Sequence, residues 1–277
     1  MLYWLLIATL GTYFLVVLVC FVFQRRYIYQ THGSLNAAAV SLTSIADSTF
    51  VSIQTEDGQN IEAWYTPPRD NRYIVIFFHG SADSPDHRAT RFLALTTDGF
   101  GVIAPYFRGF GRSTGSPTEA GLLLDAKAVY SYCSTLYPPE RIALWGFSLG
   151  SAVAVLLAAK VKVAALILEA PFTSLAAIAK YSVPFIPMGL ILRDEYRADL
   201  AIASVAAPIL MLHGEADREA PVSLGELLFE AASQPKEFVR FSAGAHANLD
   251  RYGALAVVRR FLASLPLNAA PLPPPEP

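Results

Sequence analysis

The chain has 277 residues, enough for one large domain with a substantial core. Its formal net charge is −2, with acidic and basic residues interspersed, and the absence of a basic stripe argues against nucleic acid as a partner. The two cysteines, Cys20 and Cys133, lack metal-ligand spacing, so the sequence predicts neither a bound metal nor another cofactor, and it gives no oligomeric state.

The N-terminus is a long apolar segment. Leu2 to Phe23 is almost wholly apolar, and as a helix with about 1.5 Å rise per residue it would span roughly 33 Å. A cleaved signal peptide is the alternative, but that would need a basic residue before the apolar run and a small-residue cleavage site. We therefore predict a transmembrane anchor at residues 1–24. Arg25 and Arg26 follow it, and the positive-inside rule places the rest of the chain in the cytoplasm.

Beyond a linker at residues 25–49, short apolar runs alternate with helical stretches up to residue 265, and a proline-rich tail occupies 266–277. The predicted strands are Phe50–Thr55, Ile61–Tyr65, Tyr73–Phe78, Gly101–Tyr106, Ile142–Trp145, Val163–Leu168, Ile209–Leu212 and Glu237–Phe241. The predicted helices are Ala89–Thr97, Glu119–Leu136, Leu149–Lys160, Val222–Ala232 and Arg251–Leu265. The pair Asp57-Gly58 predicts a hairpin between the first two strands. The alternation predicts an α/β domain at 50–265, with a mostly parallel sheet and helices on both faces.

The sharpest motif is Gly146-Phe147-Ser148-Leu149-Gly150, between a predicted strand and a nearly all-apolar helix. A G-x-S-x-G sequence at such a turn is typical of a nucleophile elbow, which exposes the serine at the carboxyl edge of the sheet. Its glycines allow the strand and helix backbones to approach closely. We therefore interpret Ser148 as a nucleophile rather than as part of a structural turn.

A serine hydroxyl needs a base, and the base needs a carboxylate that orients it. His246 lies in a loop of small residues after the last predicted strand, and this position favours it as the base. The expected chain order is serine, acid, histidine, and the loop after the strand Ile209–Leu212 offers Asp217, with Glu215 as the second choice. The backbone N–H groups of Leu149 and Ser81 are the predicted oxyanion donors.

Together these motifs resemble the membrane-anchored branch of the α/β-hydrolase superfamily, which includes lysophospholipase-like and acyl-protein-thioesterase-like enzymes. The resemblance runs from about Phe50 to Leu265. It rests on motifs that include Phe78-His79-Gly80, the segment Tyr106 to Ser113, Gly146 to Gly150, Glu169 to Phe172, His213 to Asp217 and Gly244 to His246. It implies an α/β-hydrolase fold and a structural role for His79. Relatives often carry asparagines after His-Gly, where this chain has Ser81, and this departure puts the second oxyanion donor in doubt.

The segment 173–207 is a short, apolar insert before the acid loop. It is interpreted as a lid over an acyl pocket that faces the bilayer, and the alternative is a helix that simply packs on the sheet. The predicted substrate-binding side chains are Phe172, Tyr181, Phe185 and Met188.

The sequence thus predicts a membrane-anchored serine hydrolase acting on an acyl ester or thioester, with a small-molecule acyl substrate and the lipid bilayer as partners. The alternatives are a serine aminopeptidase-like hydrolase, for which the sequence lacks a large cap and acidic residues placed for an amine, and a non-catalytic membrane-tethered scaffold. Ser148 excludes dehalogenase chemistry, which would need an aspartate there.

Overall fold

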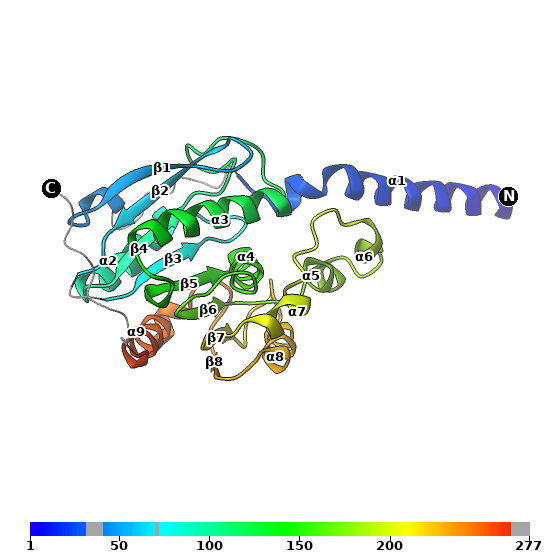
Figure 1. Ribbon diagram of the computed structural model, residues 1–277. Helices are drawn as coiled ribbons and strands as arrows, with labels where there is room; N and C mark the ends of the chain where they lie inside the picture. The colour runs from blue at the N-terminus through cyan, green and yellow to red at the C-terminus, as the bar shows by residue number, and fades with distance from the viewer. Residues whose placement is uncertain (32–40, 70–71, 267–277) are drawn as a thin grey trace.

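The computed structural model describes residues 1–31, 41–69 and 72–266, in which a long N-terminal helix precedes alternating strands and helices (Figure 1). The strands are β1 Thr49–Gln54, β2 Asn60–Thr66, β3 Ile74–Phe78, β4 Gly101–Pro105, β5 Ile142–Phe147, β6 Ala165–Glu169, β7 Ile209–Gly214 and β8 Lys236–Phe241. The helices are α1 Leu2–Ile28, α2 Ala89–Thr97, α3 Glu119–Leu136, α4 Leu149–Ala158, α5 Leu175–Ser182, α6 Met188–Ile191, α7 Ala198–Ala201, α8 Val222–Ala231 and α9 Ala254–Ser264. Each predicted strand and helix is present. The last helix begins later than predicted, because Gly253 before it has a φ of 92°.

The strands form one eight-stranded sheet in the order β1-β2-β4-β3-β5-β6-β7-β8. β1 and β2 form the predicted hairpin, and β2 also pairs antiparallel with β4. The pairs from β4 to β8 are all parallel, which confirms the predicted α/β-hydrolase fold. Strands β3 to β7 are buried along their whole length, which is why their sequences are continuously apolar. Because parallel strands end at the same edge, the loops after β3, β5, β7 and β8 meet there.

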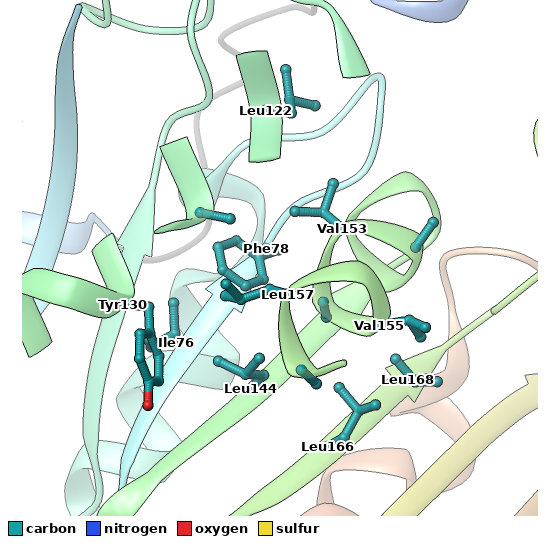
Figure 2. Close-up of a cluster of buried hydrophobic side chains, with 14 of the residues drawn as sticks. Ile76, Phe78, Leu122, Tyr130, Leu144, Val153, Val155, Leu157, Leu166 and Leu168 are labelled. Atoms are coloured by element: carbon teal, nitrogen blue, oxygen red, sulfur yellow. The ribbon is translucent and has the colours of Figure 1, made fainter. Parts of the chain in front are cut away.

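Helices cover both faces of the sheet and define two apolar cores. On one face, side chains of α3, α4 and α8 pack against β3, β5 and β6. Figure 2 shows part of this layer, where Leu122 of α3 and Val153 of α4 lie above Ile76, Leu144 and Leu166 of the sheet. On the opposite face, α2 and α9 cover the sheet. Strands β3 to β7 are therefore shielded from water on both sides, whereas β1 and β8 at the edges are partly exposed.

α1 extends away from the domain as a single long helix (Figure 1). Within the described residues it is the one helix that is both long and apolar enough to cross a bilayer. Nearly all its side chains are exposed to solvent in the isolated chain, and Gln24 near its end is its one buried residue. The helix continues to Ile28, four residues beyond the predicted end of the anchor at residue 24. Its last turns contact the domain.

The predicted linker at 25–49 is not wholly separate from the domain. Leu42 and Ile45 are buried in the core that α2 and α9 cover, and the Trp64 indole donates a hydrogen bond to the Leu42 carbonyl. Tyr29 is also buried, and its hydroxyl bonds to that of Tyr196. Three apolar or aromatic side chains, Tyr29, Leu42 and Ile45, thus fix both ends of the linker. Residues 32–40, and all but Pro266 of the predicted tail, lie outside the described residues.

A buried ion pair lies behind the turn that carries Ser148. The Arg91 guanidinium on α2 donates two hydrogen bonds to the Glu169 carboxylate, at 2.5 and 3.1 Å, and a third to Asp250 at 2.9 Å. Glu169 is fully buried at the end of β6, and its carbonyl accepts the Ser148 N–H at 2.9 Å. The pair therefore ties one helix to the strand that supports the nucleophile.

We expect Arg91→Met to lower the free energy of unfolding by about 3–5 kcal/mol, because it leaves the buried Glu169 carboxylate without its partner. Denaturant unfolding in detergent measures this. The double variant Arg91→Met/Glu169→Leu removes both charges, so it should recover much of the loss. Equal losses in the single and double variants would contradict this account.

Candidate active site

Ser148 occupies the sharp turn between β5 and α4, with φ 51° and ψ −118°. This left-handed backbone is unusual for a residue with a side chain and indicates local strain. A Cβ on Gly146 would lie 2.2 Å from the Gly150 carbonyl oxygen, and one on Gly150 would lie 2.1 Å from that of Phe78. The close packing of β5, α4 and β3 therefore requires both glycines, as the motif predicts.

The loop after β8 brings His246 to Ser148. The His246 Nε2 lies 2.9 Å from the Ser148 Oγ, which is hydrogen-bonding distance. The Phe147 ring packs beside the imidazole, with centroids 5.2 Å apart, and Asn248 accepts the Ala245 N–H and so shapes the loop. His246 and Ser148 are 98 residues apart in the chain and meet at the carboxyl edge of the sheet.

Asp217 lies in the loop after β7 and bonds to the other nitrogen of the same imidazole. Its Oδ2 is 2.7 Å from the His246 Nδ1, while its Oδ1 accepts the N–H groups of Glu219 and Ala220. The Ala216 N–H in turn donates to the Gly244 carbonyl, which joins the acid loop to the base loop. Glu215, the second candidate acid, is exposed and lies outside this chain of hydrogen bonds.

The charges of the site follow from this geometry. Burial alone would raise the pKa of Asp217, but the His213 and His246 rings and the Ala220 N–H hold it well below its usual value. Burial alone would lower the pKa of His246, whereas the Asp217 carboxylate raises it, and the net direction is upward from 6.5. Asp217 therefore stays ionised, and its charge is placed to stabilise a protonated His246 ring.

His79 supports the loop after β3, in the structural role that the family resemblance implies. Its Nε2 accepts the Phe107 N–H at 3.1 Å, so its Nδ1 carries the proton and donates to the Gly80 carbonyl at 2.7 Å. Burial lowers the pKa of His79 to about 4, which keeps the ring neutral. The Ser81 carbonyl accepts the N–H of Gln30, just beyond α1. These contacts fix the loop that brings Ser81 to the wall of the hollows that Ser148 also lines.

Two hollows meet at Ser148 and His246. The first has a volume of about 350 Å³, and its walls are mainly apolar side chains of the insert, α1 and β6 loop, among them Tyr27, Ile28, Phe172, Ile178, Met188 and Leu192. The second has a volume of about 390 Å³ and is more polar, with Asp83, His87 and Arg88 in its wall. Ser81, Ser148, Glu219 and His246 line both. A bound molecule could therefore place an apolar end in the first hollow and a polar end in the second, with Ser148 between them.

Two of the predicted substrate-binding residues line the apolar hollow and two do not. Phe172 and Met188 are in its wall, together with Leu149 and Ser81. Tyr181 and Phe185 lie outside it, with 57% and 84% of their surfaces exposed, so the structure does not bring them into this hollow. The Tyr181 hydroxyl instead lies 3.3 Å from the Ser223 hydroxyl on α8. Tyr27 and Ile28 also line this hollow, and no sequence pattern indicates this, because it depends on how the end of α1 packs against the insert.

The chemistry that this arrangement supports is nucleophilic. Among the described residues, no group of three or more His, Cys, Asp or Glu side chains is placed to hold a metal ion. Arg88 sits over the Phe147 ring at 4.2 Å and pairs with the Asp83 carboxylate at 2.8 Å, so its charge is largely balanced within the polar hollow. The arrangement therefore combines a serine hydroxyl, a hydrogen-bonded imidazole and an ionised carboxylate.

Comparisons with known proteins agree with the fold. A family model described as serine aminopeptidase, S33 matches residues 69–188. An uncharacterised protein of Mycobacterium tuberculosis is 37% identical over 247 residues, covering 86% of this chain and 87% of that protein. The lysophosphatidylserine lipase ABHD12 of Danio rerio is 30% identical over 238 residues, covering 69% of this chain and 62% of that protein.

Solved structures share the fold at lower sequence identity. The esterase Pf2001 of Pyrococcus furiosus matches with a TM-score of 0.69 and 21% identity, covering 83% of this chain and 97% of that structure. An α/β-hydrolase of Vibrio vulnificus matches with a TM-score of 0.70 and 21% identity, covering 87% and 92%. On the relatives, the sheet order and these structural matches, the chain belongs to the α/β-hydrolase superfamily.

Proposed function

We propose that this protein is a membrane-anchored serine hydrolase that cleaves acyl esters or thioesters of lipid-like substrates through an acyl-serine intermediate. The observation that carries the proposal is the hydrogen-bonded series from Asp217 to His246 to Ser148, at the base of an apolar hollow. The Danio rerio relative is named as a lipase of an acylated lipid, and the Pyrococcus furiosus protein as an esterase, which supports this substrate class.

In the acylation step, the Ser148 Oγ attacks the carbonyl carbon while its proton passes to the His246 Nε2. The carbonyl oxygen becomes an oxyanion, which the N–H groups of Leu149 and Ser81 would stabilise, and the positive end of α4 adds to this. The intermediate then collapses. The bond to the leaving alcohol or thiol breaks, and the leaving group takes the proton from His246.

In the deacylation step, a water molecule gives a proton to His246 and attacks the acyl carbon. A second tetrahedral intermediate forms, and its collapse releases the carboxylic acid while the proton returns to the Ser148 oxygen. The reaction is therefore balanced by one water for each acyl group released, and the same two N–H groups would serve both intermediates.

The two hollows suggest the orientation of the substrate. The acyl chain would occupy the apolar hollow, because burial of its methylene groups is favourable by about 0.8 kcal/mol each. The polar leaving group would lie in the second hollow, near Arg88 and Asp83. Insertion of α1 into a bilayer would keep this site close to such substrates, and the proposal retains the cytoplasmic orientation that Arg25 and Arg26 predict.

Amide hydrolysis is a weaker alternative. The matching family model is described as a serine aminopeptidase, which would need carboxylates free to bind a substrate amine. Of the two acidic residues in the hollows, Asp83 already pairs with Arg88 and His87. Glu219 is largely exposed. Comparing p-nitrophenyl esters, lysolipids, acyl thioesters and aminoacyl amides as substrates separates these possibilities, and we expect the amides to be the poorest.

We expect Ser148→Ala to lower kcat for ester hydrolysis by on the order of 10⁴-fold or more, because the nucleophile is removed. The fluorophosphonate labelling of the wild-type protein should be lost as well. Ser131→Ala, at an exposed serine on α3, serves as the control and should keep both activity and labelling. Near wild-type activity in folded Ser148→Ala protein would refute the acyl-serine mechanism, and an unlabelled, inactive wild type would favour a scaffold.

The pH profile should reflect the raised pKa of His246. Because the base works only when it is neutral, kcat/KM should fall on the acid side with a midpoint above the ordinary 6.5. Asp217→Asn removes the charge that stabilises the imidazolium, so the midpoint should move to lower pH while kcat falls by about 10⁴-fold. Glu215→Gln, at the neighbouring exposed acid, should leave the profile unchanged. If Glu215→Gln moved the midpoint and Asp217→Asn did not, the residue that orients the base would be Glu215.

The apolar hollow should set the preference for acyl length. Ala179 lies in its wall, and a tryptophan there would fill the space for a long chain. We expect Ala179→Trp to lower kcat/KM for long-chain p-nitrophenyl esters about ten- to hundredfold relative to the acetate ester. An equal loss for both esters would place the acyl chain elsewhere.

A further inference from the structure

The segment Val183–Leu192, named here the insert loop, runs from the end of α5 through α6 and lies beside the half of α1 nearest the domain (Figure 1). Gln24 joins the two. Its side-chain Nε2 donates to the Ile191 carbonyl at 3.0 Å, and its Oε1 accepts the Arg193 N–H at 2.7 Å. Arg25 adds a two-pronged ion pair with Asp194, at 2.8 and 3.0 Å. The end of the insert loop is therefore fixed to the end of α1.

The other end of the insert loop reaches farther along α1. The Tyr13 hydroxyl donates to the Phe185 carbonyl at 2.9 Å. With a rise of about 1.5 Å per residue, Tyr13 is roughly 16 Å from Gln24 along the helix. The insert loop therefore follows α1 toward its N-terminus, beside the apolar surface proposed to lie in the bilayer.

The composition of the insert loop suits hydrocarbon rather than water. It contains only apolar residues, and Phe185 and Leu190 are 84% and 87% exposed. Cationic side chains lie just outside it, at Lys180 and Arg193, where their charges can reach lipid head groups. The Arg193 guanidinium also lies 4.4 Å from the Phe21 ring of α1.

Part of the insert-loop backbone is also hydrogen-bonded without water. The N–H groups of Ile186, Met188, Leu190 and Leu192 bond to carbonyls within the loop. Two prolines have no N–H to satisfy, and α1 side chains bond to the Phe185 and Ile191 carbonyls. An unpaired backbone group costs several kcal/mol in hydrocarbon, so this pairing lowers the cost of insertion.

The same two elements form walls of the apolar hollow at Ser148. Tyr27 and Ile28 of α1 line it, as do Val183, Met188 and Leu192 of the insert loop. We propose that the insert loop enters the bilayer leaflet that holds the domain-proximal half of α1. Acyl chains then reach Ser148 from that leaflet, past the loop and the end of α1, without crossing water. This inference rests on the proposed function for its substrate, whereas insertion of the loop is tested separately.

Fluorescence quenching tests insertion directly in the full chain. The accessible Cys20 is replaced by alanine, and the buried Cys133 stays unlabelled. Single cysteines at Phe185→Cys and Leu190→Cys carry an NBD label, with Leu136→Cys at the far end of α3 as the matched exposed control. The proteins are placed in phosphatidylcholine vesicles with or without a doxyl group in the acyl chains.

We expect a blue-shifted emission and doxyl quenching for labels at 185 and 190, and neither for the label at 136. Quenching of all three labels by aqueous iodide, with no effect of doxyl lipid, would overturn the inference.

Activity provides the second measurement. The double variant Phe185→Glu/Leu190→Glu should lose at least about tenfold in hydrolysis of long-chain esters embedded in vesicles, because carboxylates are strongly disfavoured in hydrocarbon. It should hydrolyse a water-soluble acetate ester like the wild type, since neither side chain lines the hollow. Leu136→Glu should change neither activity. Equal activity of the double variant on vesicle substrates would refute delivery through the leaflet.

Failure of the proposed function would give different results from failure of the loop inference. Active Ser148→Ala protein would refute the mechanism and leave the quenching result intact, whereas unquenched labels with inactive Ser148→Ala protein would refute only the loop inference.

Discussion

The close packing of α4 against β3 and β5 is the constraint on which the site depends. Because the helix starts within contact of two strand backbones, the chain can turn only through the strained conformation of Ser148. That turn holds the hydroxyl at the edge where the loops after β7 and β8 arrive. The base and the acid then need only short loops to reach it. A looser turn would leave three polar side chains at a sheet edge without a shared hydrogen-bond series.

Much of this could be predicted from the sequence, because the deciding signals are local. Strands buried on both faces are continuous apolar runs, so their positions were predicted to within a few residues. Ser148 was identified because its glycines, strand and helix are adjacent in the chain. Asp217 and His246 required one further rule, the chain order of the fold, and the structure places both within hydrogen-bonding distance of each other. Their catalytic roles stay a proposal.

The features that sequence reasoning missed depend on packing between distant segments. Phe185 and Phe172 are both aromatic residues near the insert, yet one faces solvent and the other the hollow. No local pattern distinguishes them, because α1 and α5 decide which side chains are enclosed. Leu42 was likewise placed in a linker, since its neighbours are small and polar, but the Trp64 indole holds its carbonyl against the core. Gln24 stands at the end of the apolar run, and no local pattern indicates that its partners lie in the insert.

The contact between the Gln30 N–H and the Ser81 carbonyl has a practical consequence for studies of the enzyme. A fragment that begins after α1 would lose Tyr27 and Ile28 from the wall of the apolar hollow, and a cut beyond Gln30 would also release the loop that carries Ser81. Without these side chains one wall of the apolar hollow would be open, so the acyl-length selectivity of the fragment would differ from that of the 277-residue chain. For the proposed hydrolase, substrate surveys on such a fragment would therefore overstate how bulky an acyl group the 277-residue chain can bind.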